Sequence, residues 1–116
     1  MFKFHDIGGK KIAELTAENV VIREAQDMLE LMADLGYQEC SRMIIYEKNL
    51  SKDFFNLKTK LAGDILQKFS NYKMKLSIVG DFSKYTSKSL RDFIRESNRG
   101  NMIFFVEDLQ SALQLI

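Results

Sequence analysis

The sequence contains no proline and no tryptophan, one cysteine, Cys40, and one histidine, His5. A single cysteine cannot build a disulfide framework within the chain. A zinc site made of cysteine and histidine needs three or four such ligands, and a Ser-His-Asp triad could use only His5. We therefore expect no metal, no other cofactor and no catalytic centre of these kinds. Any chemistry must use carboxylates, hydroxyls and lysines.

Long apolar runs are also missing. The longest run extends from Met102 to Val106, far short of the roughly 20 residues that cross a membrane. The first residues, from Met1 to Asp6, lack the apolar stretch of a signal peptide. An unpaired cysteine is typical of a reducing compartment. These features predict a cytoplasmic protein without a membrane partner.

The charge is balanced overall but unevenly distributed. The net charge is +1, which argues against bulk attraction to nucleic acid. Residues 51–100 nevertheless have a clear excess of lysine and arginine, and the segments on either side are acidic. This basic middle can be read as solvated helix faces, or as a surface that meets an anion or a partner. With 116 residues, 46% of them hydrophobic, the chain is expected to form one globular domain.

Strand and helix patterns alternate along the chain. Gly8 and Gly9 separate two strand-like runs and predict a tight hairpin, because its turn needs positive φ angles. Further strands are expected at 42–46, 75–80 and 102–106. Helices are expected at 23–35, ended by Gly36; at 51–70, capped by Ser51; from Thr86 or Ser87 to a stop at Gly100; and after a cap at Asp108.

This order predicts a single α/β domain over residues 1–116. Its core is a mixed, mostly parallel five-stranded sheet with an N-terminal β-hairpin and four helices, in the order β-β-α-β-α-β-α-β-α. Strand–helix–strand units give parallel neighbours with right-handed crossovers. Only the first strand, which is joined by the hairpin, should run antiparallel.

The carboxyl edge of such a sheet is where ligands usually bind. Two loops are expected there, at 47–51 and 80–89. The second is rich in hydroxyls and lysines and leads into a helix N-terminus, which favours anions. The ordinary alternative is that its serines and threonines cap helices and its lysines keep the surface soluble. The candidate ligand-binding residues are Ser51, Asp81, Ser83, Lys84, Thr86, Ser87 and Lys88.

Other candidates are weaker. Glu47, Asp53 and Asp81 could converge near the same edge and hold a magnesium ion, although their spacing is unspecific. His5 is expected on an edge strand in a structural or exposed position. Nothing in the sequence around Cys40 lowers the pKa of its thiol, so we expect it to be inert.

Several segments carry a family resemblance. They include Phe54 to Thr59, Leu61 to Gly63, Ile65 to Tyr72 and Val79 to Tyr85, together with Gly9 to Leu15, Ser89 to Ile94 and Glu96 to Asn98. In these segments the chain resembles the bacterial family called domain of unknown function 4180, over nearly its whole length. The resemblance implies no known activity and transfers no catalytic residue.

A second resemblance concerns topology. A hairpin followed by strand–helix units is similar to STAS-type domains, the antagonists of anti-sigma factors. Those domains place a regulatory serine at the start of the helix after the third strand, where Ser51 falls here. The loop lacks their Asp-Ser-rich signature, and a plain N-cap is the favoured reading of Ser51.

Three functions are compatible with these features. The favoured one is a binding or regulatory module that recognises a protein or a small anionic ligand through the two loops. The alternative is an enzyme that acts on an anionic or phosphorylated small molecule with Asp53 or Asp81 as base. Nucleic-acid binding by residues 84–99 is disfavoured, since that segment offers little stacking surface. A homodimer that covers the first strand is left open.

Overall fold

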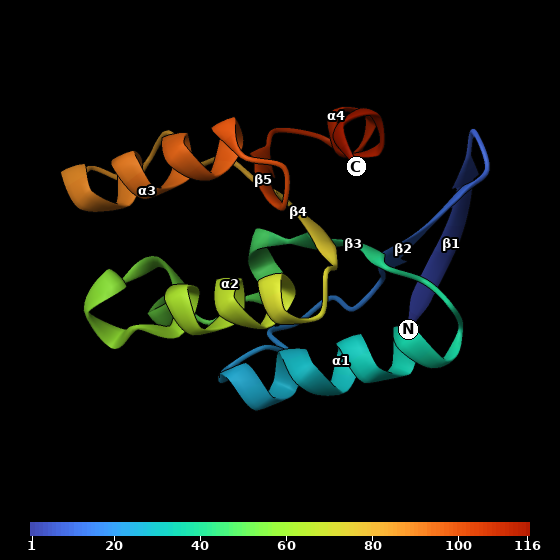
Figure 1. The fold of residues 1–116 in the computed structure, drawn as a ribbon. Coiled ribbons are helices and arrows are strands. Elements are labelled where there is room, and N and C mark those ends of the chain that lie inside the picture. The colour runs from blue at the N-terminus through green and yellow to red at the C-terminus, as the bar shows by residue number, and fades with distance from the viewer.

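The computed structural model describes residues 1–116, and its centre is a five-stranded sheet with the order β1-β2-β3-β4-β5 (Figure 1). The first two strands are antiparallel and the others are parallel, as predicted. The strands are β1 (Phe2–Ile7), β2 (Lys10–Leu15), β3 (Arg42–Tyr46), β4 (Lys75–Val79) and β5 (Ile103–Val106). The helices are α1 (Ala25–Tyr37), α2 (Leu61–Asn71), α3 (Lys88–Arg99) and α4 (Leu109–Leu115).

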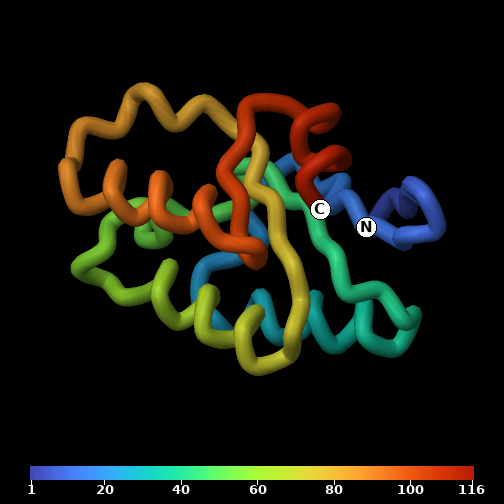
Figure 2. Tube along the Cα trace, turned by 45° about the horizontal axis from the view of Figure 1, so that its top comes forward, coloured from blue at the N-terminus to red at the C-terminus, as the bar shows by residue number.

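The helices cover the sheet unequally. Because the strands follow one another in space as they do in the chain, right-handed crossovers place α1, α2 and α3 on one side. Helix α4 contacts β4 and β5 from the other side (Figure 1). The β1–β2 hairpin extends at the far end of the sheet, as the tube in Figure 2 shows. None of the helices is both long and apolar enough to span a membrane.

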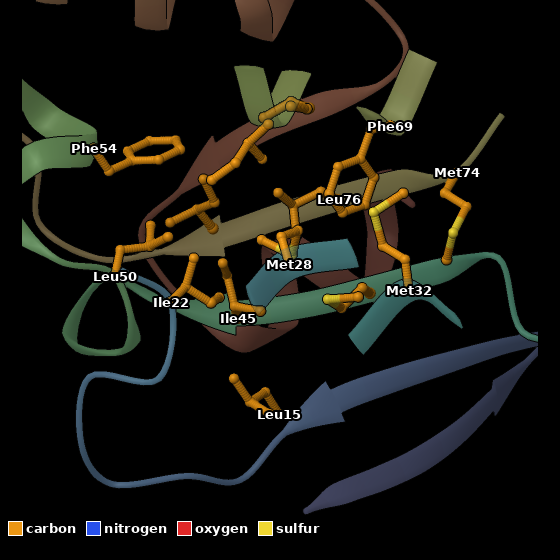
Figure 3. Packing of buried hydrophobic residues seen from close by; sticks show 14 of the residues in the cluster. Leu15, Ile22, Met28, Met32, Ile45, Leu50, Phe54, Phe69, Met74 and Leu76 are labelled. Atoms are coloured by element: carbon orange, nitrogen blue, oxygen red, sulfur yellow. The ribbon is translucent and has the colours of Figure 1, made fainter. Parts of the chain in front are cut away.

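The core has two parts, one on each face of the sheet. The larger is a cluster of 20 buried residues that joins β2 to β5 with α1 and α2. Figure 3 shows Met28 and Met32 from α1 and Phe69 from α2 meeting Ile45 and Leu76 of the sheet. The smaller cluster has 7 buried residues and lies under α4. The three-helix face therefore supplies most of the apolar burial that stabilises the fold.

Most of the predicted turns and caps are confirmed. Gly8 and Gly9 have φ angles of 59° and 83° and form the hairpin turn. Ser87 accepts a hydrogen bond from the Leu90 amide and caps α3, which ends at Gly100. Asp108 accepts a hydrogen bond of 2.8 Å from the Ser111 amide and caps α4.

The predicted long helix at 51–70 is wrong in its first half. The chain forms short 3₁₀ turns at Glu47–Asn49, Lys52–Phe55 and Leu57–Thr59 before α2 begins. The Thr59 hydroxyl bonds the carbonyl oxygens of Asp53 and Asn56, and the Asn56 side chain accepts from the Lys58 amide. Such local side-chain bonds compete with helical ones. Lys60 then takes a φ of 68°, which ends the turns.

The predicted end of the first helix is also displaced. Gly36 lies within the last turn of α1, and Glu39 takes the left-handed conformation with a φ of 57°. The start is set by Asp27, whose carboxylate accepts hydrogen bonds from the Arg23 and Glu24 amides. The helix therefore begins two residues later than its apolar spacing predicts.

Candidate functional site

The loops after β3 and β4 share one groove at the carboxyl edge of the sheet. Its volume is about 620 Å³. The first loop and the 3₁₀ turns that follow it supply most of the lining, and the β4–α3 loop closes one side. The lining residues are Val20, Glu47, Lys48, Leu50, Lys52, Phe55, Asn56, Lys84 and Tyr85. The two loops predicted to meet at this edge do meet.

Glu47 is the one carboxylate in the groove. It follows β3 directly, and its side chain is 17% exposed. Its Oε2 accepts a hydrogen bond of 2.5 Å from the Tyr85 hydroxyl and forms an ion pair of 2.8 Å with the Lys84 ammonium. Burial, together with this carboxylate, raises the pKa of Tyr85 well above its ordinary value. The contacts of Tyr85 and Lys84 with Glu47 connect the β4–α3 loop to the end of β3.

Gly80 makes this arrangement sterically feasible. A Cβ atom at this position would lie 2.7 Å from both the Cβ and the Oε1 of Glu47. Contacts that short are not tolerated, so a side chain here would push Glu47 out of its place. The glycine is needed for close approach and not for its φ angle, which lies outside the left-handed region.

Aromatic rings form one wall of the groove. The Phe55 and Tyr85 rings are stacked with centroids 4.8 Å apart. Phe82 lies 6.0 Å from Phe55 and contacts Phe105 of β5 edge to face at 5.2 Å. Offset and edge-to-face pairs of this kind add to the gain from burial. The wall is thus continuous with the core and held in place by it.

Asn49 holds the loop before the groove in shape. It is fully buried. Its side-chain oxygen accepts from the Tyr46 amide, and its amide group donates to the carbonyl oxygens of Ala17 and Asn19 at 2.8 and 3.1 Å. Its own carbonyl accepts from the Val21 and Ile22 amides. Sequence reasoning missed this residue, because an asparagine in a loop carries no sign of its distant partners.

The groove is rich in lysine. Lys84 is bound to Glu47, and Lys48 forms an exposed ion pair of 3.0 Å with Glu18 outside the groove. Lys52 has no acidic partner within ion-pair distance. The lining therefore has three lysines and one carboxylate.

Of the predicted ligand-binding residues, only Lys84 lines the groove. Asp81 accepts hydrogen bonds from the amide and hydroxyl of Ser83, and these bonds hold the pKa of Asp81 below its ordinary value. Ser87 is used as the α3 cap, and Lys88 pairs with Asp92 at 2.8 Å. Thr86 is exposed between them. Apart from Thr86, these residues have structural partners of their own.

Ser51 lies next to the groove but not in its lining. It stands at the start of a 3₁₀ turn without capping it, so the predicted N-cap hydrogen bond is wrong. The hydroxyl oxygen is buried and has no hydrogen-bond partner. A kinase could reach this oxygen only after local opening of the loop.

The three carboxylates considered for magnesium do not converge. No group of three or more His, Cys, Asp or Glu side chains is close enough together to hold a metal ion. Glu47 is bound to Lys84 and Tyr85, and Asp81 is turned toward Ser83. Asp53 does not line the groove. The magnesium alternative is overturned.

A second polar cluster joins β1, β2 and β3 away from the groove. Glu14 accepts from the Tyr46 hydroxyl at 2.6 Å and lies 2.8 Å from the Nε2 of His5. Burial and the Glu14 carboxylate raise the pKa of Tyr46 to about 12. Burial alone would raise the pKa of Glu14, but the bonds from Tyr46 and His5 outweigh it and lower that pKa. His5 therefore has the structural position expected of it.

Cys40 is buried, and its thiol contacts the carbonyl oxygens of Lys11 and Arg42 at 3.5 and 3.4 Å. These contacts leave the sulfur enclosed by backbone. Cys40 therefore has a packing position, and its predicted inertness stays a prediction.

The fold and groove define a small mixed α/β domain with a basic, aromatic-walled site at the carboxyl edge of its sheet. The chain belongs to the family described as a domain of unknown function, DUF4180, whose model matches residues 7–116. The comparison with curated proteins and the comparison with solved structures gave no match.

Proposed function

We propose that this chain is a small cytoplasmic bacterial binding module that recognises a negatively charged group next to an apolar or aromatic part. The ligand is either a small anion or an acidic segment of a protein partner. It binds in the groove between the 47–56 segment and the β4–α3 loop. The proposal includes no chemical step.

The charge of the lining carries the proposal. Three lysines surround the groove, and its single carboxylate, Glu47, is already neutralised by Lys84. Lys52 has no acidic partner, and the partner of Lys48 is exposed and lies outside the groove. A groove with excess positive charge attracts anions and concentrates them locally. An incoming carboxylate or phosphate would give Lys52 the partner that it lacks.

The aromatic wall supports the second half of the proposal. Phe55 and Tyr85 are stacked and remain half-buried at the groove. Ligand sites typically combine apolar and aromatic walls with a few polar groups that fix orientation. A ligand ring or apolar side chain could pack on this wall while its anion meets the lysines.

A set of three probes tests the proposal by amide chemical shifts. Phenyl phosphate carries both an anion and a ring, inorganic phosphate only the anion, and phenol only the ring. We expect phenyl phosphate to shift the amides of Lys52, Lys84 and Tyr85 at lower concentrations than either of the other two. An acidic peptide with one phenylalanine provides the protein-like arm.

A matched pair of variants locates the binding. Lys52→Gln removes the unpaired lysine from the groove, and Lys58→Gln changes an exposed lysine that does not line it. We expect only Lys52→Gln to weaken phenyl phosphate binding, and more strongly at low salt. Equal weakening by both variants, or no shifts in the wild type, would contradict the proposal.

The enzyme alternative has no observation in its favour. Asp81 has a lowered pKa, which makes it a weaker base, and Asp53 is absent from the groove lining. The likeness to STAS-type domains and a regulatory role for Ser51 stay predictions, and the binding proposal does not depend on them. Unchanged mobility of labelled DNA and RNA is expected in the same buffers.

A further inference from the structure

The two outer edges of the sheet differ in whether their outward-facing backbone groups have hydrogen-bond partners. At the β5 edge, the Asn98 side chain of α3 accepts a hydrogen bond of 2.7 Å from the Phe105 amide and donates one of 3.2 Å to the Phe105 carbonyl. Both outward-facing backbone groups of Phe105 are thereby occupied, and α3 lies against the strand. Covering an edge in this way prevents pairing with another chain.

The β1 edge has no such protection. The hairpin register and the hydrogen bond from the Thr16 amide to the Met1 carbonyl show which residues face β2. By the alternation of antiparallel ladders, the backbone groups of Phe2, Phe4 and Asp6 point outward. The strand has no proline and no bulge, and no segment lies beyond it (Figures 1 and 2).

Exposed apolar side chains gather on the same strand. Of the six large hydrophobic side chains that are exposed, Met1, Phe4 and Ile7 belong to β1 or adjoin it. The Phe4 side chain is 39% exposed, in the middle of the strand. A six-residue edge strand whose outer side is unpaired, and which also exposes apolar groups, favours pairing with another strand.

We propose that β1 pairs with β1 of a second copy of this chain, antiparallel, to form a continuous ten-stranded sheet across a twofold axis. Because the β5 edge is blocked, each copy has one free edge, and pairing closes at a dimer instead of growing into a filament. The twofold axis passes beside Phe4, which lies opposite Phe4 of the other copy.

The backbone pattern selects this register. With Phe4 opposite its own copy, Phe2 lies opposite Asp6, so all three outward-facing residues of each strand form hydrogen-bonded pairs. Shifting by two residues in either direction leaves fewer such pairs. One of these shifts also places Lys3 opposite Lys3, which like charge disfavours. In the proposed register, no carboxylate lies directly opposite another carboxylate, and no lysine lies directly opposite another lysine.

Charge and polarity on the other face of the strand fit the same register. Lys3 lies opposite His5 of the second copy, and that His5 is already bound to Glu14. The Lys3 ammonium therefore lies near the Glu14 carboxylate of the second copy, which carries the opposite charge. An extended peptide from another protein could also use this edge, but it would need to match this pattern of charge and outward groups. A second copy matches it by symmetry.

Sedimentation equilibrium of the full chain tests the dimer. We expect a species of twice the 13.5 kDa monomer mass, at concentrations up to about 1 mM. Phe4→Pro removes an outward N–H together with the Phe4 ring, and proline is accepted on edge strands. Phe4→Ala, which removes the ring but keeps the N–H, separates the two effects. Phe4→Pro should raise the dissociation constant of the dimer by roughly tenfold or more. Tyr72→Lys, at an aromatic residue that is 63% exposed elsewhere, is the matched control and should leave the dimer intact.

A cysteine pair tests the register. In a Cys40→Ser background, Phe4→Cys should form an intermolecular disulfide, because opposing Cα atoms of a hydrogen-bonded pair lie about 5.5 Å apart. Phe2→Cys should not, because the two copies of residue 2 would be separated by four residues of strand, about 13 Å. A monomeric wild type, a dimer that survives Phe4→Pro, or equal crosslinking at both positions would overturn the proposal. Circular dichroism melting of each variant separates loss of pairing from loss of folding.

Discussion

The Tyr85 hydroxyl donates a hydrogen bond to the Glu47 carboxylate across the gap between the β4–α3 loop and the end of β3. The two residues are 38 positions apart in the chain. Lys84 contacts the same oxygen, and the Tyr85 ring is stacked on Phe55. One carboxylate therefore fixes both the polar and the aromatic side of the groove.

Removing this carboxylate should destabilise the fold measurably. In Glu47→Ala, the half-buried Tyr85 hydroxyl loses its acceptor, and we expect a loss of about 1–3 kcal/mol in the free energy of unfolding. Urea denaturation measures this loss. In the double variant with Tyr85→Phe, the two losses should overlap, with a coupling energy of about 0.5–3 kcal/mol. Simple additivity would show that the bond contributes nothing.

Gly80→Ala should be destabilising despite its small size. The new methyl group would lie 2.7 Å from Glu47, and overpacking of this kind costs about 1–3 kcal/mol. Gly63→Ala is the matched control, because nothing lies within 4 Å of a Cβ at that helical position. It should stabilise the protein by up to about 1 kcal/mol. Equal effects in thermal unfolding would contradict the steric role of Gly80.

Sheet topology was predictable because its signals are local. A glycine pair between two strand-like runs predicts a hairpin. Alternating strand and helix patterns predict parallel strands, because strand–helix–strand crossovers are almost always right-handed. The caps at Ser87 and Asp108 follow from one side chain and an amide three residues away. Such short-range rules need no knowledge of distant contacts.

The 51–60 segment was not predictable on the same basis. Its apolar spacing favours a helix, but the bonds made by Asn56 and Thr59 within the segment outweigh that preference. In the observed turns, Phe55 lies beside Tyr85 at the groove.

The sequence predicted that the two loops meet at the carboxyl edge of the sheet, but among the predicted ligand-binding residues only Lys84 lines the groove there. The edge of the sheet and Lys84 followed from topology. The roles of Asn49, Glu47 and Lys52 depend on which segments meet in space, and single residue types in loops carry no record of that. Of the hydroxyl residues that the sequence favoured, Ser83 and Ser87 have local structural partners.

Asn49→Ala should be among the most destabilising single changes in the loops. It removes three side-chain hydrogen bonds from a fully buried site and leaves the carbonyls of Ala17 and Asn19 without their donor. We expect a loss of about 3 kcal/mol in urea denaturation. Asn19→Ala, at an exposed position, should stay within about 0.5 kcal/mol of the wild type. Similar values for both variants would contradict this assignment.

Alkaline pH should weaken the fold through Tyr46. Burial and the Glu14 carboxylate raise its pKa in the folded protein from 10.0 to about 12. A group with a raised folded-state pKa contributes stability that is fully present below its unfolded pKa and is lost as the pH rises toward the folded value. The advantage of the wild type over Tyr46→Phe in free energy of unfolding should therefore shrink between pH 10 and about 12. Urea titrations of both proteins at several pH values measure it, and Tyr85→Phe serves as a second reference because the pKa of Tyr85 is also raised. A difference that stays constant over this range would show that Tyr46 ionises alike in the folded and unfolded chain.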